Sequence, residues 1–394
     1  MPSHEVLVEE AKSWRRHIHQ HPELLFDLPQ TMRFVAEKLK EFGCDEVVTG
    51  IAKSGVVGVI RGHAGPGRTI MLRADMDALP IAEQTNLPHA SKIENRMHAC
   101  GHDGHTAILL AAARQFAESR DFAGTVVAVF QPAEEGGAGG RVMIEEGLFD
   151  RFGIDEVFGM HNKPGLAVGA FAMRPGTIMA AGDRFVVSLT GRGGHAALPH
   201  LTPDPVLAAS HLITALQSIA SRYTDPFDPV VVSTTYINGG NPAALNVIPA
   251  TVEVGGSIRT IARATRTAVE KRFRDIVEAT ARLYEMEAGI DWRPGYPPTV
   301  NDPEMTQEAA AAAMRVAGAE RVDANCPCIM GSEDFSYMLQ QRPGAIIWLG
   351  NGDTADLHHP SYDFNDAAIV HGIRYWTELV KQRQPEDQRP VCRV

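Results

Sequence analysis

The stretch MHACGHDGH, residues 97–105, places one thiol and three imidazoles within nine residues. It lies between an apolar, strand-like run at 69–73 and a helical pattern at 106–118. Polar clusters that follow the carboxyl ends of strands are typical of an open α/β sheet whose binding site lies at that edge. So many sulfur and nitrogen donors in one short loop also favour a transition-metal site. This stretch therefore predicts both an α/β fold and a metal centre.

Three further polar clusters follow apolar, strand-like segments along the chain. They are QPAEE at residues 131–135, GMHN at 159–162 and LHHP at 357–360. In an open α/β sheet the carboxyl ends of the strands meet at one edge, where they form a shared crevice. The sequence therefore predicts one metal centre whose ligands come from four distant segments.

From about residue 182 the pattern of the chain changes. Strand and helix patterns now follow one another in the order β-α-β-β-α-β, which is the order of a small split sheet with two helices on one face. The strands are expected at 185–189, 230–237, 251–258 and 286–292, and the helices at 205–221 and 265–284. After the proline-rich segment 292–298 the α/β pattern resumes. We predict an α/β fold with a discontinuous catalytic domain, residues 1–181 and 297–394, whose mixed sheet is flanked by helices, and an inserted ferredoxin-like domain, residues 182–296.

The composition argues against several classes of protein. With 394 residues, of which 44% are hydrophobic, the chain can bury at least one large core. Its net charge of −11 comes from interspersed acidic and basic residues without a basic stripe, which argues against binding to nucleic acid or an anionic membrane. No apolar run is long enough to span a bilayer, and residues 1–14 lack the apolar core of a signal peptide. We therefore expect a cytoplasmic protein that acts on a small molecule.

The five cysteines form no even set, and a cytoplasmic chain of this length does not need disulfides. Cys326 and Cys328 are too closely spaced for a structural zinc knuckle, so we expect buried free thiols there. Cys100 differs because it shares its loop with histidines. A thiolate and a neutral imidazole both bind zinc-like ions, and Gly101 lets Cys100 and His102 converge. A redox role for the Cys100 thiol is the alternative, and protection of the thiol from alkylation by metal would argue against it.

Two adjacent carboxylates, Glu134 and Glu135, follow the strand-like run at 125–130. Adjacent side chains after a strand point in different directions, so one of them can hold a metal while the other reaches a water molecule. Proton transfer in metal-assisted hydrolysis needs such a free base. The alternative is a solvated acidic turn, but the apolar strand before the pair and the glycines after it favour a buried position.

Two histidines, His161 and His358, each follow apolar residues and precede a turn. This is the setting of either a metal ligand or a core histidine with satisfied hydrogen bonds. His359 competes with His358 for the ligand role. Asp75 and Asp77 are candidates for carboxylates that orient an imidazole and raise its basicity.

Six motifs resemble the M20 metallopeptidase family, and the resemblance covers nearly the whole chain. They are RRHIHQHPE at 15–23, RADMDALP at 73–80, HACGHD at 98–103, QPAEE at 131–135, GHAA at 194–197 and GSEDF at 331–335. Their order matches in particular the amidohydrolase branch of the family, with its hippurate hydrolases, N-acyl-amino-acid amidohydrolases and auxin-conjugate hydrolases.

This resemblance implies a centre of two divalent metal ions, which are zinc, manganese, cobalt or nickel. The implied ligands are Cys100, His102, Glu135, His161 and His358. Glu134 would be the general base, which takes a proton from the attacking water and later protonates the departing amine. Asp77 would orient the catalytic groups. In other branches of the family a histidine stands in the place of Asp75, so the role of Asp75 stays open.

The inserted domain is implied to act as a lid and to mediate dimerisation, in a homodimer or a dimer of dimers. His195 resembles the histidine that stabilises the oxyanion, which is often supplied by the partner subunit. Arg259 and Asn246 resemble the positions that contact the carboxylate and the carbonyl of the substrate, and Gly331 is a third candidate for substrate contact. Without the resemblance, a surface histidine and a surface salt bridge would be the preferred interpretations of His195 and Arg259.

The leading hypothesis is metal-dependent hydrolysis of the amide bond of N-acyl amino acids, such as hippurate-like or N-acetyl substrates. The same chemistry on dipeptides, N-acetyl-diaminopimelate or carbamoyl amino acids is the alternative, because the motifs do not separate these substrates. A metal-dependent binding protein without turnover is disfavoured, because both Glu134 and His195 are present.

Overall fold

The structure is a computed structural model that describes residues 4–384. The chain divides into two compact units. Unit 1 comprises Met1–Gly176, Val300–Pro327 and Asp334–Val394, and unit 2 comprises Thr177–Thr299 and Cys328–Glu333. The domain boundaries that we placed before residue 182 and after residue 296 stay a prediction, and the segment 328–333 joins unit 2 in addition to the inserted segment.

Unit 1 contains a mixed eight-stranded sheet, so the predicted fold class is confirmed. The strand order is β1-β2-β4-β3-β5-β16-β6-β15. Its strands are β1 (Glu46–Ile51), β2 (Gly55–Arg61), β3 (Thr69–Asp75), β4 (Thr125–Gln131), β5 (Glu156–Pro164), β6 (Phe171–Ala172), β15 (Val322–Asp323) and β16 (Gly344–Gly352). β4, β3, β5 and β16 are parallel, and their sequences are continuous apolar runs because helices cover the sheet.

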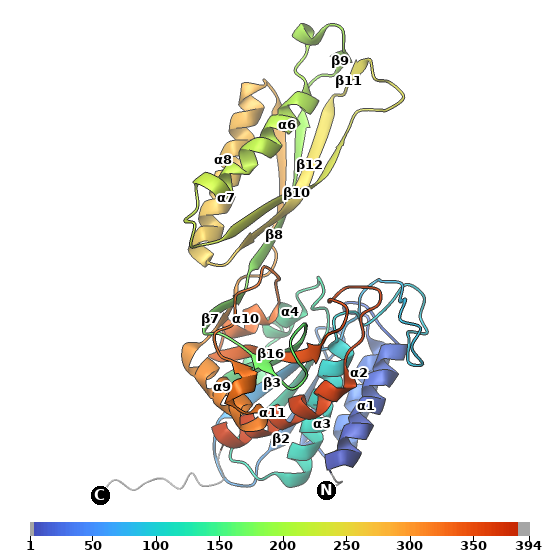
Figure 1. Ribbon diagram of the computed structural model, residues 1–394, viewed down its shortest axis with the longest axis vertical. Coiled ribbons are helices and arrows are strands. Elements are labelled where there is room, and N and C mark those ends of the chain that lie inside the picture. The colour runs from blue at the N-terminus through green and yellow to red at the C-terminus, as the bar shows by residue number, and fades with distance from the viewer. Residues whose placement is uncertain (1–3, 385–394) are drawn as a thin grey trace, which may run out of the picture. The chain divides into compact units, whose positions relative to one another are not determined.

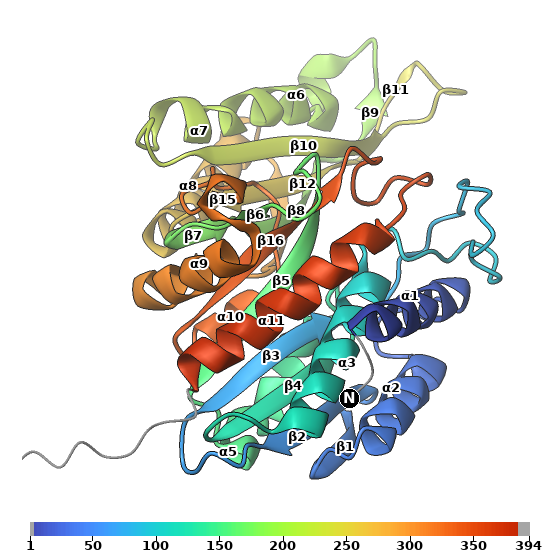
Figure 2. The same ribbon diagram turned by 60° about the horizontal axis from the view of Figure 1, so that its bottom comes forward.

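Helices of unit 1 cover the sheet. The helices α1, α3, α11 and α9 form one layer, in which each contacts the next, and Figure 2 shows this layer in front of the sheet. The most buried member is α3, because its segment 107–113 is apolar on all sides. The helices are α1 (His4–Gln20), α2 (Pro29–Glu41), α3 (His102–Ser119), α4 (Gly139–Glu145), α5 (Leu148–Phe152), α9 (Pro303–Ala317), α10 (Phe335–Leu339) and α11 (Ile369–Arg383), with short 3-10 turns at Ala319–Arg321 and Asp366–Ala368.

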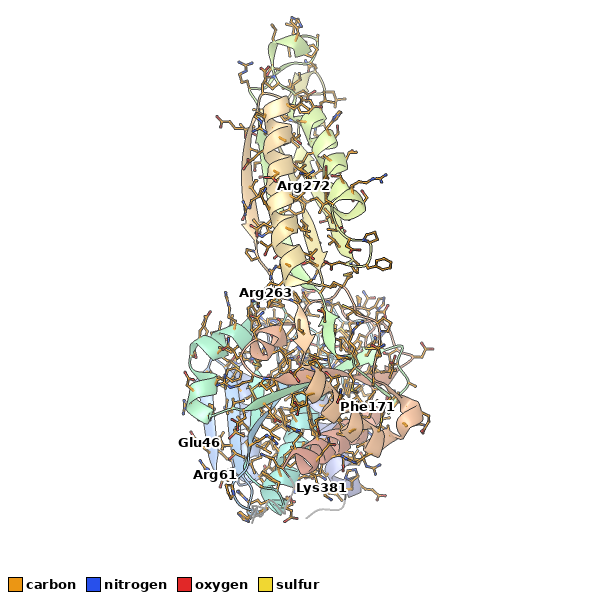
Figure 3. All side chains as sticks on the ribbon, turned by 90° about the vertical axis from the view of Figure 1, so that its left-hand side faces the viewer. Glu46, Arg61, Phe171, Arg263, Arg272 and Lys381 are labelled. Carbon is orange, nitrogen blue, oxygen red and sulfur yellow. The ribbon has the colours of Figure 1, made fainter. Side chains whose placement is uncertain are left out.

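Unit 2 has the predicted β-α-β-β-α-β order around a four-stranded antiparallel sheet. The strand order is β10-β12-β8-β13, and Figure 1 shows α6 and α8 side by side against this sheet. Its main elements are β8 (Ala181–Thr190), α6 (Pro205–Leu216), α7 (Ser218–Arg222), β10 (Val230–Gly239), β12 (Thr251–Thr260), α8 (Arg263–Leu283) and β13 (Glu287–Arg293). In Figure 3, Arg263 marks the beginning of α8 and Arg272 its middle.

Local sequence explains how these unit 2 elements form. The Asp204 carboxylate accepts from the N–H groups of residues 206 and 207, and Pro205 occupies the first turn, so α6 begins where the sequence caps it. Phe185 of β8 packs against Phe273 of α8, with ring centroids 4.6 Å apart, and so joins helix and sheet. The shorter elements are β7 (Gly176–Met179), β9 (Gly194–His195), a 3-10 turn at Pro199–Leu201, β11 (Val247–Ile248) and β14 (Thr299–Asn301). Among residues 4–384, no helix combines the length and the apolar character that a membrane crossing requires.

A buried ionic network ties α1 to segments that are distant in sequence. Arg15 is 1% exposed and pairs with Asp366 at 2.7 Å. The ring of His19 lies between two carboxylates, with Nδ1 2.8 Å from Asp103 and Nε2 3.3 Å from Glu83. Burial by itself lowers the pKa of His19, but the charge of Asp103 and the hydrogen bonds of both carboxylates raise it to about 9. His19 is therefore a buried cation at neutral pH.

We predict that His19 makes the stability of unit 1 depend on pH. Its pKa is raised above the unfolded value of about 6.5, so its contribution to the free energy of unfolding is complete below pH 6.5 and is lost as the pH rises through about 9. Denaturant unfolding of wild type and His19→Gln should show a larger stability difference at pH 6 than at pH 10. An equal difference at both pH values would contradict this prediction.

Candidate metal centre

Four segments of unit 1 bring the predicted metal ligands together. Cys100 and His102 lie at the start of α3, and Glu135 follows the end of β4. His161 lies in β5, and His358 comes from the loop after β16. The parallel strands β3, β4 and β5 are adjacent in the sheet, so the segments that follow them meet at one edge. This is the arrangement that the sequence predicted for the four polar clusters.

The five side chains form overlapping groups of donor atoms. The Cys100 Sγ lies 3.4 Å from Nε2 of His161. Oε1 of Glu135 lies 3.3 Å from Nε2 of His358 and 4.0 Å from Nε2 of His102. The ligand atoms of Cys100, Glu135 and His358 all lie within 4.8 Å of one another. The same holds for those of His102, Glu134 and Glu135. Glu135 belongs to both groups.

Hydrogen bonds assign the tautomers of two of these histidines. Nδ1 of His102 lies 2.7 Å from the carbonyl oxygen of Asp77, and Nδ1 of His161 lies 2.7 Å from that of Asn162. A carbonyl oxygen only accepts, so each Nδ1 carries a proton, and Nε2 is the nitrogen that a metal ion, or a second proton, can occupy. Both Nε2 atoms face the cluster. A histidine that binds a metal through Nε2 requires the tautomer with its proton on Nδ1.

The donor set fits divalent metal ions. The Nε2 atom of His102 is fully buried and has no hydrogen-bond partner among residues 4–384, although Asp75 and Glu135 surround it at 3.6 and 4.0 Å. A buried acceptor without a donor is costly unless something else satisfies it. A set of thiol, imidazole and carboxylate donors suits zinc and related transition metals. A cation among these groups would satisfy Nε2 and the carboxylates at once.

The protonation states of the cluster also call for a cation. Burial, with Glu135 and Glu134 close by, raises the pKa of the Cys100 thiol well above its usual range. Burial alone would lower the pKa of His102, but Asp75, Asp77 and Glu135 raise it to about 10. Burial together with His105 lowers the pKa of His161. The carboxylates therefore dominate the field of this site, and a proton on His102 takes the place that a metal ion would fill.

Asp77 orients both neighbouring glutamates. Its two carboxylate oxygens accept from the backbone N–H groups of Glu134 and Glu135, at 2.9 and 3.1 Å, and its carbonyl oxygen holds His102. The Glu134 side chain is 7% exposed and lies next to His102 and Glu135. One predicted orienting residue thus fixes two predicted ligands and the predicted base through three hydrogen bonds.

The geometry of the loop distinguishes His358 from His359 as the candidate ligand. His358 adopts a left-handed backbone conformation, with φ of 65°, that turns its ring toward Glu135. The Nδ1 atom of His359 instead accepts from the N–H of Ser361 at 3.0 Å, outside the cluster. His358 is the histidine that joins the other ligands.

Asp75 lies at the back of the cluster and has partners on both oxygens. Oδ1 accepts from Nδ1 of His105 at 2.6 Å, and Oδ2 accepts from Arg73 at 2.6 Å. Arg73 also donates to Asp334 at 2.9 Å. Burial alone would raise the pKa of Asp75, but His102, Arg73 and His105 hold it well below its usual range. Asp75 is therefore an ionised carboxylate that supports His102 and His105 from behind.

Sequence reasoning did not single out His105, Asn162 or Tyr362, although all three are fully buried beside the ligands. Nε2 of His105 accepts from the N–H of Asn162 at 2.9 Å, so its lone pair is occupied and its Nδ1 proton is bonded to Asp75. His105 therefore supports the cluster and is not one of its ligands. Its position one helical turn after His102 is the signal that points to it in the sequence.

Three predicted site residues of the inserted segment, together with Gly331 from the segment Cys328–Glu333, lie in unit 2 and form two groups. His195 is in β9, which pairs with β11, and the N–H of Ala196 donates to the carbonyl oxygen of Asn246 at 2.9 Å. Nδ1 of the exposed His195 accepts from the N–H of Ala197 at 3.0 Å, so its Nε2 carries the proton and faces outward.

Arg259 and Gly331 form the second group. The Nη1 group of Arg259 donates to Oγ of Ser332, next to Gly331, at 3.1 Å. Arg259 pairs in register with Gly182, at the end of β12 opposite to the β9–β11 pair. The structure therefore brings His195 and Asn246 together, and Arg259 and Gly331 together, but keeps the two groups at opposite ends of one strand.

Gly101 is required between Cys100 and His102 for two reasons. Its φ is +92°, in the left-handed region. In addition, a Cβ atom at this position would lie 2.1 Å from Nδ2 of Asn162 and 2.6 Å from Oη of Tyr362. Any side chain here would push the ligand loop away from the residues that support it.

We predict that Gly101→Ala destabilises the protein more than Gly43→Ala. Gly43 also has a left-handed φ, of +79°, but a Cβ there meets no atom within 4 Å. Gly43→Ala should cost about 1–2 kcal/mol of backbone strain, and Gly101→Ala about 1–3 kcal/mol more because it also overpacks the site. Denaturant unfolding of the two variants measures the difference. Equal losses would show that the close contact of Gly101 is unimportant.

Comparisons with known proteins agree with this architecture. The family model of peptidase family M20/M25/M40 matches residues 71–382. The chain is 42% identical to hippurate hydrolase of Campylobacter jejuni, over 94% of this chain and 95% of that protein. It is 42% identical to an N-acetyl-L-cysteine deacetylase of Bacillus subtilis, over 93% of this chain and 86% of that protein.

A solved structure gives the same result. The structure of a Bacillus subtilis protein, a dinuclear metal binding peptidase from the M20 family, matches with a TM-score of 0.83 and 35% identity. The match covers 95% of this chain and 98% of that one. The chain therefore belongs to peptidase family M20/M25/M40, within the amidohydrolase branch to which these relatives belong.

Proposed function

We propose that this protein is a metal-dependent amidohydrolase that cleaves the amide bond of N-acyl amino acids. The observation that carries the proposal is the cluster of Cys100, His102, Glu135, His161 and His358 with Glu134 at its side, in which Cys100, His102 and His161 are buried. The relatives named hippurate hydrolase and N-acetyl-L-cysteine deacetylase support the substrate class, because both names describe removal of an acyl group from an amino acid.

The five ligands would hold two divalent ions, of zinc, manganese, cobalt or nickel. Bound ions of this kind lower the pKa of a water molecule and polarise the carbonyl group that is attacked. The protein supplies the correct tautomers of His102 and His161 through the carbonyl oxygens of Asp77 and Asn162. These fixed hydrogen bonds mean that the imidazoles need no reorientation when ions bind.

Glu134 is the proposed general base and acid. Its neighbour Glu135 takes part in the ligand group, and Asp77 holds the backbone of both residues. A carboxylate fixed in this way accepts a proton from the attacking water and returns it to the nitrogen of the departing amine. Glu134 is 7% exposed, so little bulk water reaches the carboxylate that carries the proton.

Arg259 is the proposed partner of the free carboxylate of the substrate. Its guanidinium is half-buried, and burial together with the neighbouring Arg184 lowers its pKa. A cation that lacks full compensation attracts an anion, and a guanidinium can hold a carboxylate by two parallel hydrogen bonds. Gly331 would contribute backbone contacts beside it, since Ser332 already binds Nη1 of Arg259.

His195 and Asn246 are the proposed donors to the carbonyl oxygen of the scissile amide. Nε2 of His195 carries an outward-facing proton, which suits a group that stabilises negative charge developing on oxygen. However, β12 separates these residues from Arg259 by at least eight residues, from Thr251 to Arg259, or roughly 25 Å along the strand. One amino-acid-sized substrate cannot reach both groups of the same chain, so we propose that a second subunit supplies His195 and Asn246.

A homodimer formed through unit 2 agrees with its surface. The edge strand β10 exposes Val231, Tyr236 and Ile237, and the nearby loops expose Phe227 and Leu245 at 94% and 86%. Exposed apolar side chains on an unpaired strand edge mark a surface that pairs with another chain. We further propose a cytoplasmic location, in line with the expectation from composition.

Hydrolysis of hippurate and N-acetyl amino acids by the wild-type protein is the direct test of this function. We expect activity that a chelator abolishes and added zinc or manganese restores. Glu134→Gln should lower kcat by about 10²–10⁴-fold while it still binds metal, because the amide keeps the shape of the residue. Glu145→Gln, an exposed glutamate of α4, is the matched control and should keep full activity. Activity that persists after chelation would contradict the proposal.

A second substrate class is favoured by one relative. The chain is 39% identical to a thermostable carboxypeptidase of Saccharolobus solfataricus, which covers 87% of each chain. Dipeptides carry the same free carboxylate as N-acyl amino acids, so Arg259 suits both. Adding dipeptides, N-acetyl-diaminopimelate and carbamoyl amino acids to the same assay separates these alternatives by their kcat/KM values.

Mixing two inactive variants tests whether His195 acts in the neighbouring subunit. His195→Ala should lower kcat by about 10²–10³-fold, and Arg259→Ala should mainly raise KM. After subunit exchange, a hybrid dimer has one site with both residues intact if His195 comes from the partner, so the mixture should recover activity. Recovery in the mixture, compared with either variant mixed with itself, supports the shared site. Failure to recover activity after confirmed exchange would place both residues in one subunit.

A further inference from the structure

We infer that Asn162 is a positioning residue of the metal centre, which fixes the segment of Cys100 relative to the segment of His161. This inference rests on the metal centre proposed above and extends it beyond the ligands. Asn162 follows His161 in β5 and is fully buried. Its backbone and side chain together contact the segment of Cys100 and His105 and the loop of His358, so one residue connects parts of the site that are far apart in sequence.

The backbone of Asn162 orients two histidines. Its carbonyl oxygen accepts the Nδ1 proton of His161 at 2.7 Å, which leaves Nε2 of His161 directed toward Sγ of Cys100, 3.4 Å away. Its N–H donates to Nε2 of His105 at 2.9 Å, and His105 in turn donates to Asp75 at 2.6 Å. The plane of this peptide group thereby determines how the His161 ring faces the cluster.

The side chain of Asn162 connects two further segments. Nδ2 donates to the carbonyl oxygen of Cys100 at 2.6 Å and lies 3.1 Å from Nε2 of His105, and Oδ1 accepts from Oη of Tyr362 at 2.8 Å. Tyr362 is fully buried and lies four residues after His358 in the same loop. The amide therefore joins the loop of Cys100, the end of β5 and the loop of His358, which together carry three of the proposed ligands.

The surroundings of the amide leave it no alternative position. Gly101 rests directly against it, since a Cβ atom on Gly101 would lie 2.1 Å from Nδ2 and 2.6 Å from Oη of Tyr362. If the amide were removed, the carbonyl oxygen of Cys100 and the hydroxyl of Tyr362 would both lose a buried partner. The ligand loop would then be free to shift into the space beside Gly101.

Such a shift affects metal binding before it affects the rest of the fold. Metal ligands must be held close to their final positions, and loss of the groups that orient them typically lowers metal affinity by about 10–100-fold. The hydrogen bonds of the Asn162 side chain go to the segment of Cys100 and to Tyr362, which joins the loop of His358 to the hydrophobic core. Removal of the Asn162 side chain should therefore weaken the site where Cys100 and His161 meet.

The experiment measures zinc affinity of metal-free wild type and Asn162→Ala by competition with a chromophoric chelator. We expect Asn162→Ala to bind its weaker-held zinc ion about 10–100-fold less tightly than wild type. The number of ions bound per chain at saturation, measured by elemental analysis, should stay unchanged because all five ligands remain. Neither readout depends on catalytic activity.

Asn301→Ala is the matched control. Asn301 is also fully buried, and its side chain also makes three hydrogen bonds to protein groups, with Nδ2 on the carbonyl oxygens of Arg174 and Ile346 and Oδ1 on the N–H of Ile346. These bonds lie away from the ligand loops. Asn301→Ala should lower the unfolding free energy of the metal-free protein as Asn162→Ala does, yet keep the zinc affinity of wild type.

Tyr362→Phe keeps the inference testable if Asn162→Ala does not fold. It preserves the aromatic ring and removes only the bond to Oδ1 of Asn162, so zinc affinity should fall several-fold. Wild-type zinc affinity in the folded variants, or an equal loss in Asn301→Ala, would overturn the inference while the metal centre itself stands. Wild type that binds no zinc, manganese, cobalt or nickel would instead overturn the proposed function, and the inference with it.

Discussion

Carboxylates buried at one edge of the unit 1 sheet impose the constraint on which the whole centre depends. Asp75, Asp103 and Asp334 are all 0% exposed. A buried carboxylate is strongly unfavourable unless fixed donors compensate its charge. Arg73 bridges Asp75 and Asp334, and His19 donates to Asp103. Each donor comes from a different segment, so the edge of the sheet is stable only when β3, α1, α3 and the segment before α10 are assembled together.

At the front of the cluster, the buried polar groups are only partly compensated by hydrogen-bond partners. Behind the cluster, each carboxylate oxygen of Asp75 accepts a hydrogen bond from a fixed donor. At the front, Nε2 of His102 has no hydrogen-bond partner among residues 4–384, and Glu135 belongs to two groups of potential metal ligands. A site with surplus carboxylate charge and unused lone pairs gains stability from a cation and loses it when the cation leaves. The residues behind the cluster therefore have their hydrogen bonds satisfied, whereas the predicted ligands at the front keep atoms that can bind a metal ion.

The sequence predicted much of this centre because its ligand types cluster along the chain. The loop at 97–105 and the pair Glu134-Glu135 combine unusual density with a position after a strand, and both features are local. The supporting residues carry no such signal. Asn162 and Tyr362 are ordinary residue types 200 positions apart, and their hydrogen bond exists only because β5 and the loop after β16 meet. The sequence left the choice between His358 and His359 open, since only a left-handed turn at His358 distinguishes them.

The sequence by itself determined the α/β class, the β-α-β-β-α-β order of the inserted segment and the segments that carry the candidate ligands, because periodicity and donor chemistry are properties of short stretches of sequence. Tertiary structure alone decided which nitrogen of each histidine faces the cluster, that His105 supports it from behind, and that Arg259 lies at the other end of β12 from His195. Those properties depend on which backbone carbonyl or N–H group arrives next to a side chain. Such encounters follow from the register of strands and the path of loops, which no single segment contains.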